Sequence, residues 1–215
     1  MKYKAVLFDL DGTLLDTLHD LAGAVNHVMK TYDDPVHSVD DVRRFVGNGI
    51  RNLMIRALPK GEEDPKFEEK FSEFKNYYAG HDMDLTKPYP GIMNLISDLR
   101  NNGIRLAIVS NKYQPAVTEL SRHYFKDAIE VSIGDLEGRN RKPHPDAPNA
   151  ALLALGLSAK DCLYVGDSGV DAKTAEGVGM DCVLCSWGFR ERDLLEKEKS
   201  IGIIDKPEDL LEYIN

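Results

Sequence analysis

Cysteine, positive charge and long apolar runs are all scarce in this chain, and each scarcity excludes a class of protein. Three cysteines in 215 residues are too few for the disulfide framework of a small secreted domain. The 27 basic residues are outnumbered by 36 acidic ones, a formal net charge of −9, which repels nucleic-acid phosphates at long range. We therefore expect no nucleic acid as a partner, and an anionic substrate would need a local group of positive charges.

The apolar segments are too short for membrane or export signals. No run approaches the ~18 apolar residues of a membrane span, and the first run, Ala5–Phe8, is shorter than the roughly 7–15 residues of a signal peptide. We expect a cytoplasmic protein with no membrane partner. Cys182 and Cys185 have C-x-x-C spacing in a strand-like run, but residues three apart on a strand face opposite sides. We expect them to be buried free thiols.

The order of apolar runs predicts an α/β fold with a parallel sheet. Short β-rich runs alternate with helical periodicity, as in successive βαβ units. Continuous apolar strands fit a parallel sheet that is covered on both faces. The expected strands are Lys4–Phe8, Arg105–Val109, Ala128–Ile133, Cys162–Val165, Cys182–Cys185 and Ile201–Ile204, and the expected helices are Ile92–Asn101, Pro115–His123, Asp146–Leu155, Ala172–Val178 and Glu208–Ile214.

An all-helical segment interrupts this alternation after the first strand. At about 150 residues per domain, 215 residues suggest one domain with a large insertion. We predict an α/β core of residues 1–16 and 83–215 and a helical cap of residues 17–82, without strands. Thr17 and Ser38 can cap two of its helices. A third helix carries an apolar stripe that we interpret as core packing, made of Phe67, Phe71, Phe74 and Tyr78.

Polar residues follow several predicted strands, where ligands bind in parallel α/β sheets. Asp9-Leu10-Asp11-Gly12-Thr13 follows the first strand, Ser110-Asn111 the second, and Gly166-Asp167-Ser168 the fourth, with Asp171 shortly after; Lys142 lies in the loop after the third. A lone D-x-D or Ser-Asn is common in caps and turns, but the ordered combination is specific. Four carboxylates at one edge repel one another unless a hard cation bridges them, and Mg²⁺ with phosphate oxygens fits. Lysine and serine complete a phosphate cradle.

With these motifs the sequence resembles the haloacid-dehalogenase (HAD) superfamily over nearly its whole length. Finer features resemble the phosphoglycolate phosphatase branch, among them Asp16-Thr17-Leu18, Phe45-Val46-Gly47-Asn48-Gly49 and Ser110-Asn111-Lys112. The resemblance implies a Rossmann-like core with a helical cap inserted after strand one. It also implies a Mg²⁺-dependent phosphomonoester hydrolase that acts through an aspartyl-phosphate on small phosphorylated metabolites such as 2-phosphoglycolate.

The same resemblance assigns roles to individual residues. Asp9 would attack phosphorus and Asp11 would serve as general acid and then base. Ser110, Asn111 and Lys142 would bind the phosphate oxygens. Asp9, the backbone carbonyl of Asp11, and Asp167 would bind Mg²⁺, with Asp171 in support.

Specificity is expected to lie in the cap. Gly47, Asn48 and Gly49 precede a helical run whose N-terminus could bind an anion, and Arg43 lies nearby. Lys112 could also reach the substrate. A sugar-phosphate mutase or a pyrophosphatase of the same superfamily stays open as an alternative, as does a phospho-accepting signalling module. The chain is expected to be a monomer or a homodimer.

Overall fold

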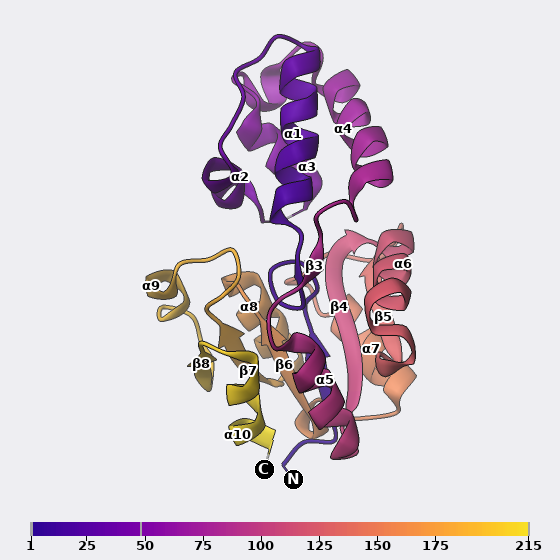
Figure 1. The fold of residues 1–215 in the computed structure, drawn as a ribbon. Helices are drawn as coiled ribbons and strands as arrows, with labels where there is room; N and C mark the ends of the chain where they lie inside the picture. The colour runs from indigo at the N-terminus through magenta and orange to yellow at the C-terminus, as the bar shows by residue number, and fades with distance from the viewer. Residues whose placement is uncertain (1, 48, 215) are drawn as a thin grey trace. The chain divides into compact units, whose positions relative to one another are not determined.

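The structure, a computed structural model, describes residues 2–47 and 49–214 and divides into two units (Figure 1). One unit combines Met1–Leu15 with Pro88–Asn215, and the other is Asp16–Lys87. We call them the core unit and the helical unit. The predicted cap, residues 17–82, lies within the second. Across the described ranges, no helix combines the length and the apolar character needed to cross a membrane.

The core unit is built on a six-stranded sheet, and the predicted α/β fold is confirmed. The strands run in the order β5-β4-β1-β6-β7-β8, and every neighbouring pair is parallel. β1 lies inside the sheet and all four of its residues are buried, which explains its continuous apolar sequence. The strands are β1 (Ala5–Phe8), β4 (Arg105–Tyr113), β5 (Val131–Asp135), β6 (Cys162–Gly166), β7 (Asp181–Cys185) and β8 (Gly202–Ile204).

Helices lie on both sides of this sheet, with α5 and α10 in front of it and α7 and α8 behind in Figure 1. Alternate residues of β1, Ala5 and Leu7, join small side chains of α7 and α8 in one apolar cluster. The two chain ends meet, since the Lys2 N–H donates to the Ile214 carbonyl at 3.0 Å. The helices of the core unit are α5 (Ile92–Asn101), α6 (Gln114–Phe125), α7 (Asp146–Leu155), α8 (Gly169–Val178), α9 (Arg192–Leu195) and α10 (Leu211–Ile214).

Several predicted boundaries were wrong, and the first two lie beside predicted site residues. β4 continues past Val109 to Tyr113, with a register shift against β5 over these last residues. α8 begins at Gly169, so Asp171 lies in its first turn and not before it. The third predicted strand began too early, because Lys126–Ala128 forms a 3-10 turn. The last predicted helix is a 3-10 turn, Pro207–Leu210, followed by the short α10.

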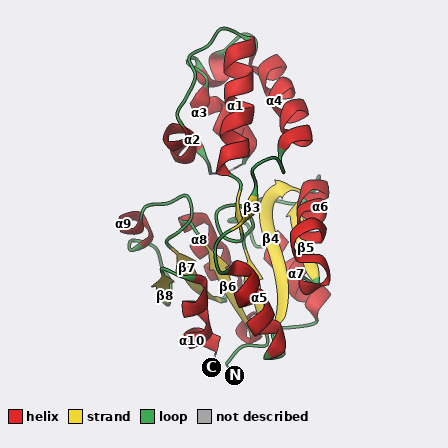
Figure 2. Cartoon of the chain, viewed as in Figure 1, coloured by secondary structure: helices red, strands yellow, loops and turns green. Residues whose placement is uncertain are grey.

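The helical unit packs four helices around its own apolar core. Figure 2 shows it as helices and loops, with strand only at its ends. The short strands β2 (Leu15–Asp16) and β3 (Lys87–Pro88) pair with each other just outside the predicted cap of residues 17–82; the described residues of that cap contain no strand, as predicted. The helices are α1 (Leu18–Thr31), α2 (Val39–Phe45), α3 (Ile50–Ala57) and α4 (Phe67–His81).

The two predicted helix caps behave differently. Ser38 forms a capping box with Asp41, each side chain bonding the other's backbone N–H, as predicted. Thr17 precedes α1 but makes no cap bond; its φ of −102° and ψ of 3° are not the extended conformation that aims a capping hydroxyl at the helix N–H groups. The predicted aromatic stripe of α4 does pack in the core, with Phe74 fully buried.

A buried aspartate fastens the start of α1 to the segment that leaves the helical unit. The Asp20 carboxylate accepts the Leu85 N–H at 2.9 Å and the Thr86 N–H at 2.8 Å. Asp20 is 5% exposed, and two backbone donors satisfy its charge where water is excluded. Hydrogen bonds therefore join the start of α1 to residues 85 and 86, in addition to any packing of side chains.

Lys70 is a buried cation between two carboxylates of the helical unit. Its Nζ lies 2.5 Å from Asp34 Oδ2 and 2.8 Å from Asp64 Oδ2, with its own side chain 6% exposed. Replacing Lys70 with methionine leaves two enclosed carboxylates without their cation, so we expect a loss of about 3 kcal/mol in unfolding free energy. Urea unfolding followed by circular dichroism measures this loss.

The exposed Lys75 on the same helix provides the control, since Lys75→Met makes the same change of charge. We expect it to alter stability by less than about 0.5 kcal/mol. Adding Asp34→Asn and Asp64→Asn to Lys70→Met should restore part of the loss, because the repulsion is then removed. Equal effects of Lys70→Met and Lys75→Met would show that the buried ion pairs contribute no net stability.

The cysteines are buried free thiols, as predicted. Burial raises the pKa of Cys162 to about 11, and it raises the pKa values of Cys182 and Cys185 well above normal. Cys182 joins the apolar cluster under α7 and α8, whereas Cys185 Sγ lies 3.9 Å from the Thr13 hydroxyl. The two sulfurs of the C-x-x-C pair therefore lie in different surroundings, as the alternation of strand side chains requires.

Candidate active site

Three neighbouring strands bring the predicted site residues of the core unit to one edge of the sheet. Phe8, the last residue of β1, pairs with β4 on one side and with β6 on the other. Asp9 follows it directly, Ser110 lies near the end of β4, and Asp167 follows β6. Because parallel strands end at the same edge, side chains that are more than 50 residues apart in the sequence become neighbours.

Lys142 connects these strands through its ammonium group. Its Nζ lies 2.9 Å from Asp9 Oδ1 and 2.8 Å from Asp171 Oδ1. It also approaches the Val109 carbonyl at 3.0 Å and the Tyr164 hydroxyl at 3.2 Å. An ammonium has three N–H donors, and these four neighbouring oxygens determine its position.

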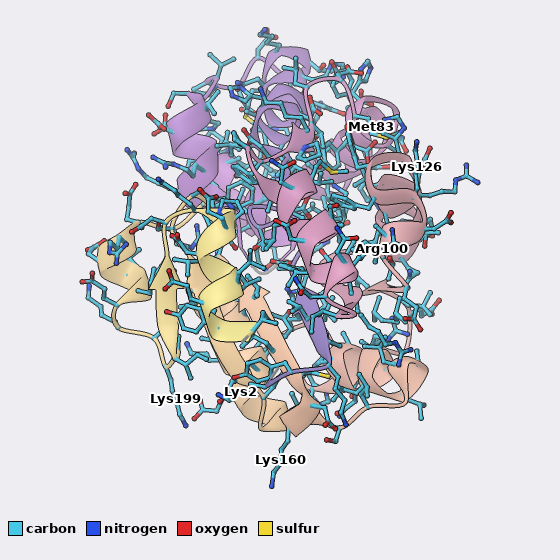
Figure 3. All side chains as sticks on the ribbon, turned by 60° about the horizontal axis from the view of Figure 1, so that its bottom comes forward. Lys2, Met83, Arg100, Lys126, Lys160 and Lys199 are labelled. Atoms are coloured by element: carbon cyan, nitrogen blue, oxygen red, sulfur yellow. The ribbon has the colours of Figure 1, made fainter. Side chains whose placement is uncertain are left out.

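The surroundings of Lys142 differ from those of ordinary lysines. Figure 3 shows Lys160 and Lys199 extending away from the ribbon, where water solvates the charge. Lys142 is 4% exposed. Burial opposes its charge, but the carboxylates of Asp171 and Asp9 outweigh this effect and hold the pKa of Lys142 well above its ordinary value. It is therefore a fixed positive charge at the edge of the sheet.

Negative charge nevertheless exceeds positive charge at this edge. Burial raises the pKa of Asp9 well above its ordinary value; Lys142 opposes the shift, and the charges of Asp171 and Asp167 add to it. Burial, with the charge of Asp171, also raises the pKa of Asp167 to about 7. Both shifts have the direction expected where carboxylates are crowded without enough cations.

These carboxylates fit a divalent cation. One oxygen from each of Asp9, Asp167 and Asp171 lies within 4.8 Å of the others, and carboxylate oxygens are the ligands that hard cations prefer. Asp171 already uses both oxygens, Oδ1 with Lys142 at 2.8 Å and Oδ2 with the Ser168 hydroxyl at 2.6 Å. Its contacts suit a residue that orients Lys142, whereas Asp9 and Asp167 are better disposed as direct ligands.

The loop after β1 positions Asp11 through a glycine turn. Gly12 has a φ of +83°, and a Cβ at this position would lie 2.3 Å from Asp167 Oδ2, so only glycine fits. The Asp11 side chain is 22% exposed, and its Oδ1 lies 3.6 Å from the Nζ of Lys112. Asp11 is thus more accessible than Asp9 and lies beside a second lysine.

Ser110 and Asn111 are both held by backbone contacts. The Ser110 hydroxyl accepts the Lys112 N–H at 3.2 Å. The Asn111 side chain bonds both backbone groups of Lys142: it accepts the N–H at 2.7 Å and donates to the carbonyl at 3.0 Å. Asn111 therefore locks the loop that carries Lys142, a contact that the sequence prediction did not include.

Three further contributors were missed by the sequence analysis. The Tyr164 hydroxyl lies 3.3 Å from the Val109 carbonyl and 3.2 Å from Lys142 Nζ. The Phe189 N–H donates to Asp167 Oδ2 at 2.7 Å. The Trp187 indole N–H donates to the Thr13 carbonyl at 3.0 Å. A polar hydroxyl within an apolar strand could have pointed to Tyr164. The Phe189 contact is made by a backbone N–H, which a sequence pattern does not reveal.

The predicted cap residues belong to the helical unit. Gly49 directly precedes α3, and both Gly47 and Gly49 have positive φ, +127° and +87°, a conformation that favours glycine. Arg43 pairs with Asp40 at 3.4 Å. Asn48 lies outside the described residues.

The comparison with known families agrees with this geometry. The family model of haloacid dehalogenase-like hydrolases matches residues 6–185, a range that contains every predicted site residue. The chain belongs to this family. This match confirms the family resemblance inferred from the motifs. The matched range begins within β1 and ends with β7.

Individual relatives align with the hydrolase over most of its length. Phosphoglycolate phosphatase 1 of Pseudomonas aeruginosa is 32% identical over 97% of this chain and 78% of the relative. Phosphoglycolate phosphatase of Rhodobacter capsulatus is 32% identical over 88% of this chain and 87% of the relative. The crystal structure of a candidate phosphoglycolate phosphatase from Lactobacillus delbrueckii subsp. bulgaricus has a TM-score of 0.94 at 34% identity, covering 100% of this chain and 99% of that one.

Proposed function

We propose that the hydrolase removes phosphate from small phosphomonoesters through an aspartyl-phosphate on Asp9, with 2-phosphoglycolate as substrate. The observation that carries this proposal is the buried pair of Asp9 and Lys142. Both contacts of the Asp9 carboxylate within the described residues, from Lys142 and from the Leu10 N–H at 2.7 Å, fall on Oδ1. This leaves Oδ2 to attack, with the carboxylate held in one orientation.

The reaction proceeds in two displacements. In the first, Asp9 Oδ2 forms a bond to phosphorus, the ester P–O bond breaks, and Asp11 donates a proton to the departing oxygen. In the second, Asp11 takes a proton from water, whose oxygen attacks the aspartyl-phosphate. Inorganic phosphate leaves and Asp9 is restored as a carboxylate. The accessible position of Asp11 suits both exchange with a leaving group and contact with water.

Mg²⁺ is the cation proposed for the acidic cluster. The carboxylates of Asp9 and Asp167 and the backbone carbonyl of Asp11 would hold it, and Asp171 would orient Lys142. When bound, the ion would offset the negative charge of the carboxylates and of the phosphoryl oxygens. Lys142, the Ser110 hydroxyl and backbone N–H groups near Asn111 would bind the remaining phosphoryl oxygens.

The substrate proposal rests on the named relatives and on charge. A small leaving group that carries its own carboxylate needs a second anion site besides the phosphate site. We propose that Gly47, Asn48, Gly49 and Arg43 of the helical unit contribute to it. The family resemblance supports this assignment, and the geometry of the core unit supports the phosphoryl chemistry independently of it.

Release of phosphate from a panel of esters tests the function. With Mg²⁺, we expect kcat/KM for 2-phosphoglycolate to exceed that for a sugar phosphate, pyrophosphate or a nucleoside monophosphate by at least about tenfold. Isomerised sugar phosphate without free phosphate would indicate a mutase, and a preference for pyrophosphate would indicate a pyrophosphatase. Arg43→Ala should lower kcat/KM for 2-phosphoglycolate more than for a neutral ester; an equal loss would remove Arg43 from the anion site.

A further inference from the structure

The segment that follows β7 contacts two separate parts of the active site. The Trp187 indole N–H donates to the Thr13 carbonyl at 3.0 Å, in the turn after β1. The Phe189 N–H donates to Asp167 Oδ2 at 2.7 Å, directly after β6. We call residues 187–189 the β7 loop. This loop joins two motifs of the site that lie far apart in the sequence.

The β7 loop is itself held against the core unit. Ser186, which immediately precedes it, donates its N–H to the Ile204 carbonyl of β8 at 3.0 Å. At the other end, Phe189 is 6% exposed, and its ring packs over Gly12, where a Cβ would lie 2.9 Å from a ring carbon. A loop that is fixed at both ends can determine the positions of the groups that it contacts.

Two glycines enclose the Asp167 carboxylate. A Cβ at Gly188 would lie 2.5 Å from Asp167 Oδ2 and closer still to the Gly12 carbonyl oxygen. A Cβ at Gly12 would also overlap Asp167 Oδ2. All of these distances are well inside van der Waals contact. Any side chain at position 188 would therefore displace Asp167 or the turn after β1.

The turn that the Trp187 indole contacts also carries Asp11. Inside this turn, the Leu10 carbonyl accepts the Thr13 N–H at 3.3 Å and the Leu15 N–H at 2.9 Å. The backbone of the turn is thus bonded to itself, and the Thr13 carbonyl is bonded from outside by Trp187. Because Thr13 is fully buried, loss of this donor would favour a shift of the turn. Such a shift would reach the Asp11 carbonyl.

The orientation of Asp167 decides how it can bind a cation. One oxygen from each of Asp9, Asp167 and Asp171 lies within 4.8 Å of the others, and this arrangement depends on the direction of the Asp167 carboxylate. The Phe189 N–H fixes that direction through Oδ2. Loss of a hydrogen bond that orients a metal ligand typically lowers metal affinity about 10- to 100-fold.

We infer that Trp187 is a positioning residue for the proposed Mg²⁺ site and acts through the β7 loop. The inference rests on the cation site of the proposed function and extends that site to a residue that contributes no ligand. Trp187 holds the loop on the turn after β1, and the loop holds Asp167 through the Phe189 N–H. Two proposed ligands, the Asp11 carbonyl and the Asp167 carboxylate, are thereby kept at a fixed separation.

Calorimetric titration of the cation-free protein with Mg²⁺ measures this role without turnover. Trp187→Phe keeps an aromatic ring but removes the N–H donor, and we expect the Kd for Mg²⁺ to rise about 10-fold. Gly188→Ala displaces the loop from Asp167 and should raise the Kd about 10- to 100-fold. Gly177→Ala on α8 is the matched control, since a Cβ there would lie 3.8 Å from the Pro143 carbonyl oxygen, an ordinary contact; its Kd should equal that of the wild type.

Excess Mg²⁺ separates positioning of the ligands from a purely structural role. At a saturating concentration, phosphate release by Trp187→Phe should return to within about threefold of the wild-type rate, since the ligands are misplaced but not removed. Thermal unfolding of the cation-free variants establishes that they are folded. If Trp187→Phe does not fold, Gly188→Ala decides in the same way.

The pattern of Mg²⁺ affinities decides the outcome. An unchanged Kd in Trp187→Phe would overturn the inference, and so would a loss of rate that excess Mg²⁺ does not restore. If the wild type binds no Mg²⁺, the proposed cation site and the inference fall together. If Trp187→Phe weakens Mg²⁺ binding and Gly177→Ala does not, but no ester is hydrolysed by the wild type, the phosphatase proposal falls and the inference stands.

Discussion

The Asp9→Asn variant is expected to fold normally and to lose turnover by at least about 10⁴-fold. The amide has the size and shape of the carboxylate but is not a nucleophile, so no covalent intermediate can form. Asp9 is also one of the two carboxylates that accompany the Lys142 ammonium. Asparagine can still accept a hydrogen bond from Lys142 through its carbonyl oxygen, which favours retention of the fold.

Phosphate release under saturating 2-phosphoglycolate and Mg²⁺ measures the effect. Circular dichroism and thermal unfolding establish that the variant is folded. Asp193→Asn is a matched control, because the Asp193 side chain is 72% exposed and lies in the short helix α9; its rate should match the wild type. If Asp9→Asn keeps more than about a tenth of the wild-type rate, Asp9 is not the nucleophile.

Removal of divalent cations is expected to abolish activity reversibly. The cluster of Asp9, Asp167 and Asp171 holds three carboxylates, two of which share the ammonium of Lys142. A phosphomonoester brings further negative charge, so without a cation both substrate binding and attack are opposed by repulsion. Activity should fall to background in excess chelator and return when Mg²⁺ is added.

Two aspartate variants locate the cation within the cluster. Asp167→Asn should raise the Mg²⁺ concentration needed for half-maximal activity at least about tenfold. Asp171→Asn should mainly lower kcat, because Asp171 contacts Lys142 and Ser168. Full activity in excess chelator would exclude a bound cation as a requirement, and an unchanged Mg²⁺ demand in Asp167→Asn would remove that residue from the ligand set.

The sequence alone determined the fold class and the positions of Asp9 and Asp167 directly after their strands. Burial on both faces makes the strands of a parallel sheet continuous apolar runs, as in Ala5–Phe8, and such runs are visible without coordinates. Polar residues directly after these runs indicate the ligand-binding edge. Asp9 and Asp167 could therefore be selected from local patterns, although they are far apart in the chain.

The predictions that failed depended on neighbours distant in sequence. The end of β4 was placed at Val109 because the polar residues Ser110 to Lys112 resemble a loop, but pairing with β5 extends the strand to Tyr113. Thr17 has the composition of a helix cap, yet its backbone is not in a capping conformation. In β4, pairing with a strand distant in sequence outweighs the local preference.

Only the tertiary structure decided how the motifs work together. Asn111 was predicted to bind phosphate. Its side chain also hydrogen-bonds the backbone of Lys142, a contact that the sequence does not reveal. The Tyr164 hydroxyl and the Phe189 N–H, which contact Lys142 and Asp167, belong to residues outside the predicted motifs. A local pattern records which side chains are polar. Which of them lie within 3 Å of one another depends on the sheet order, which brings together segments that the sequence keeps apart.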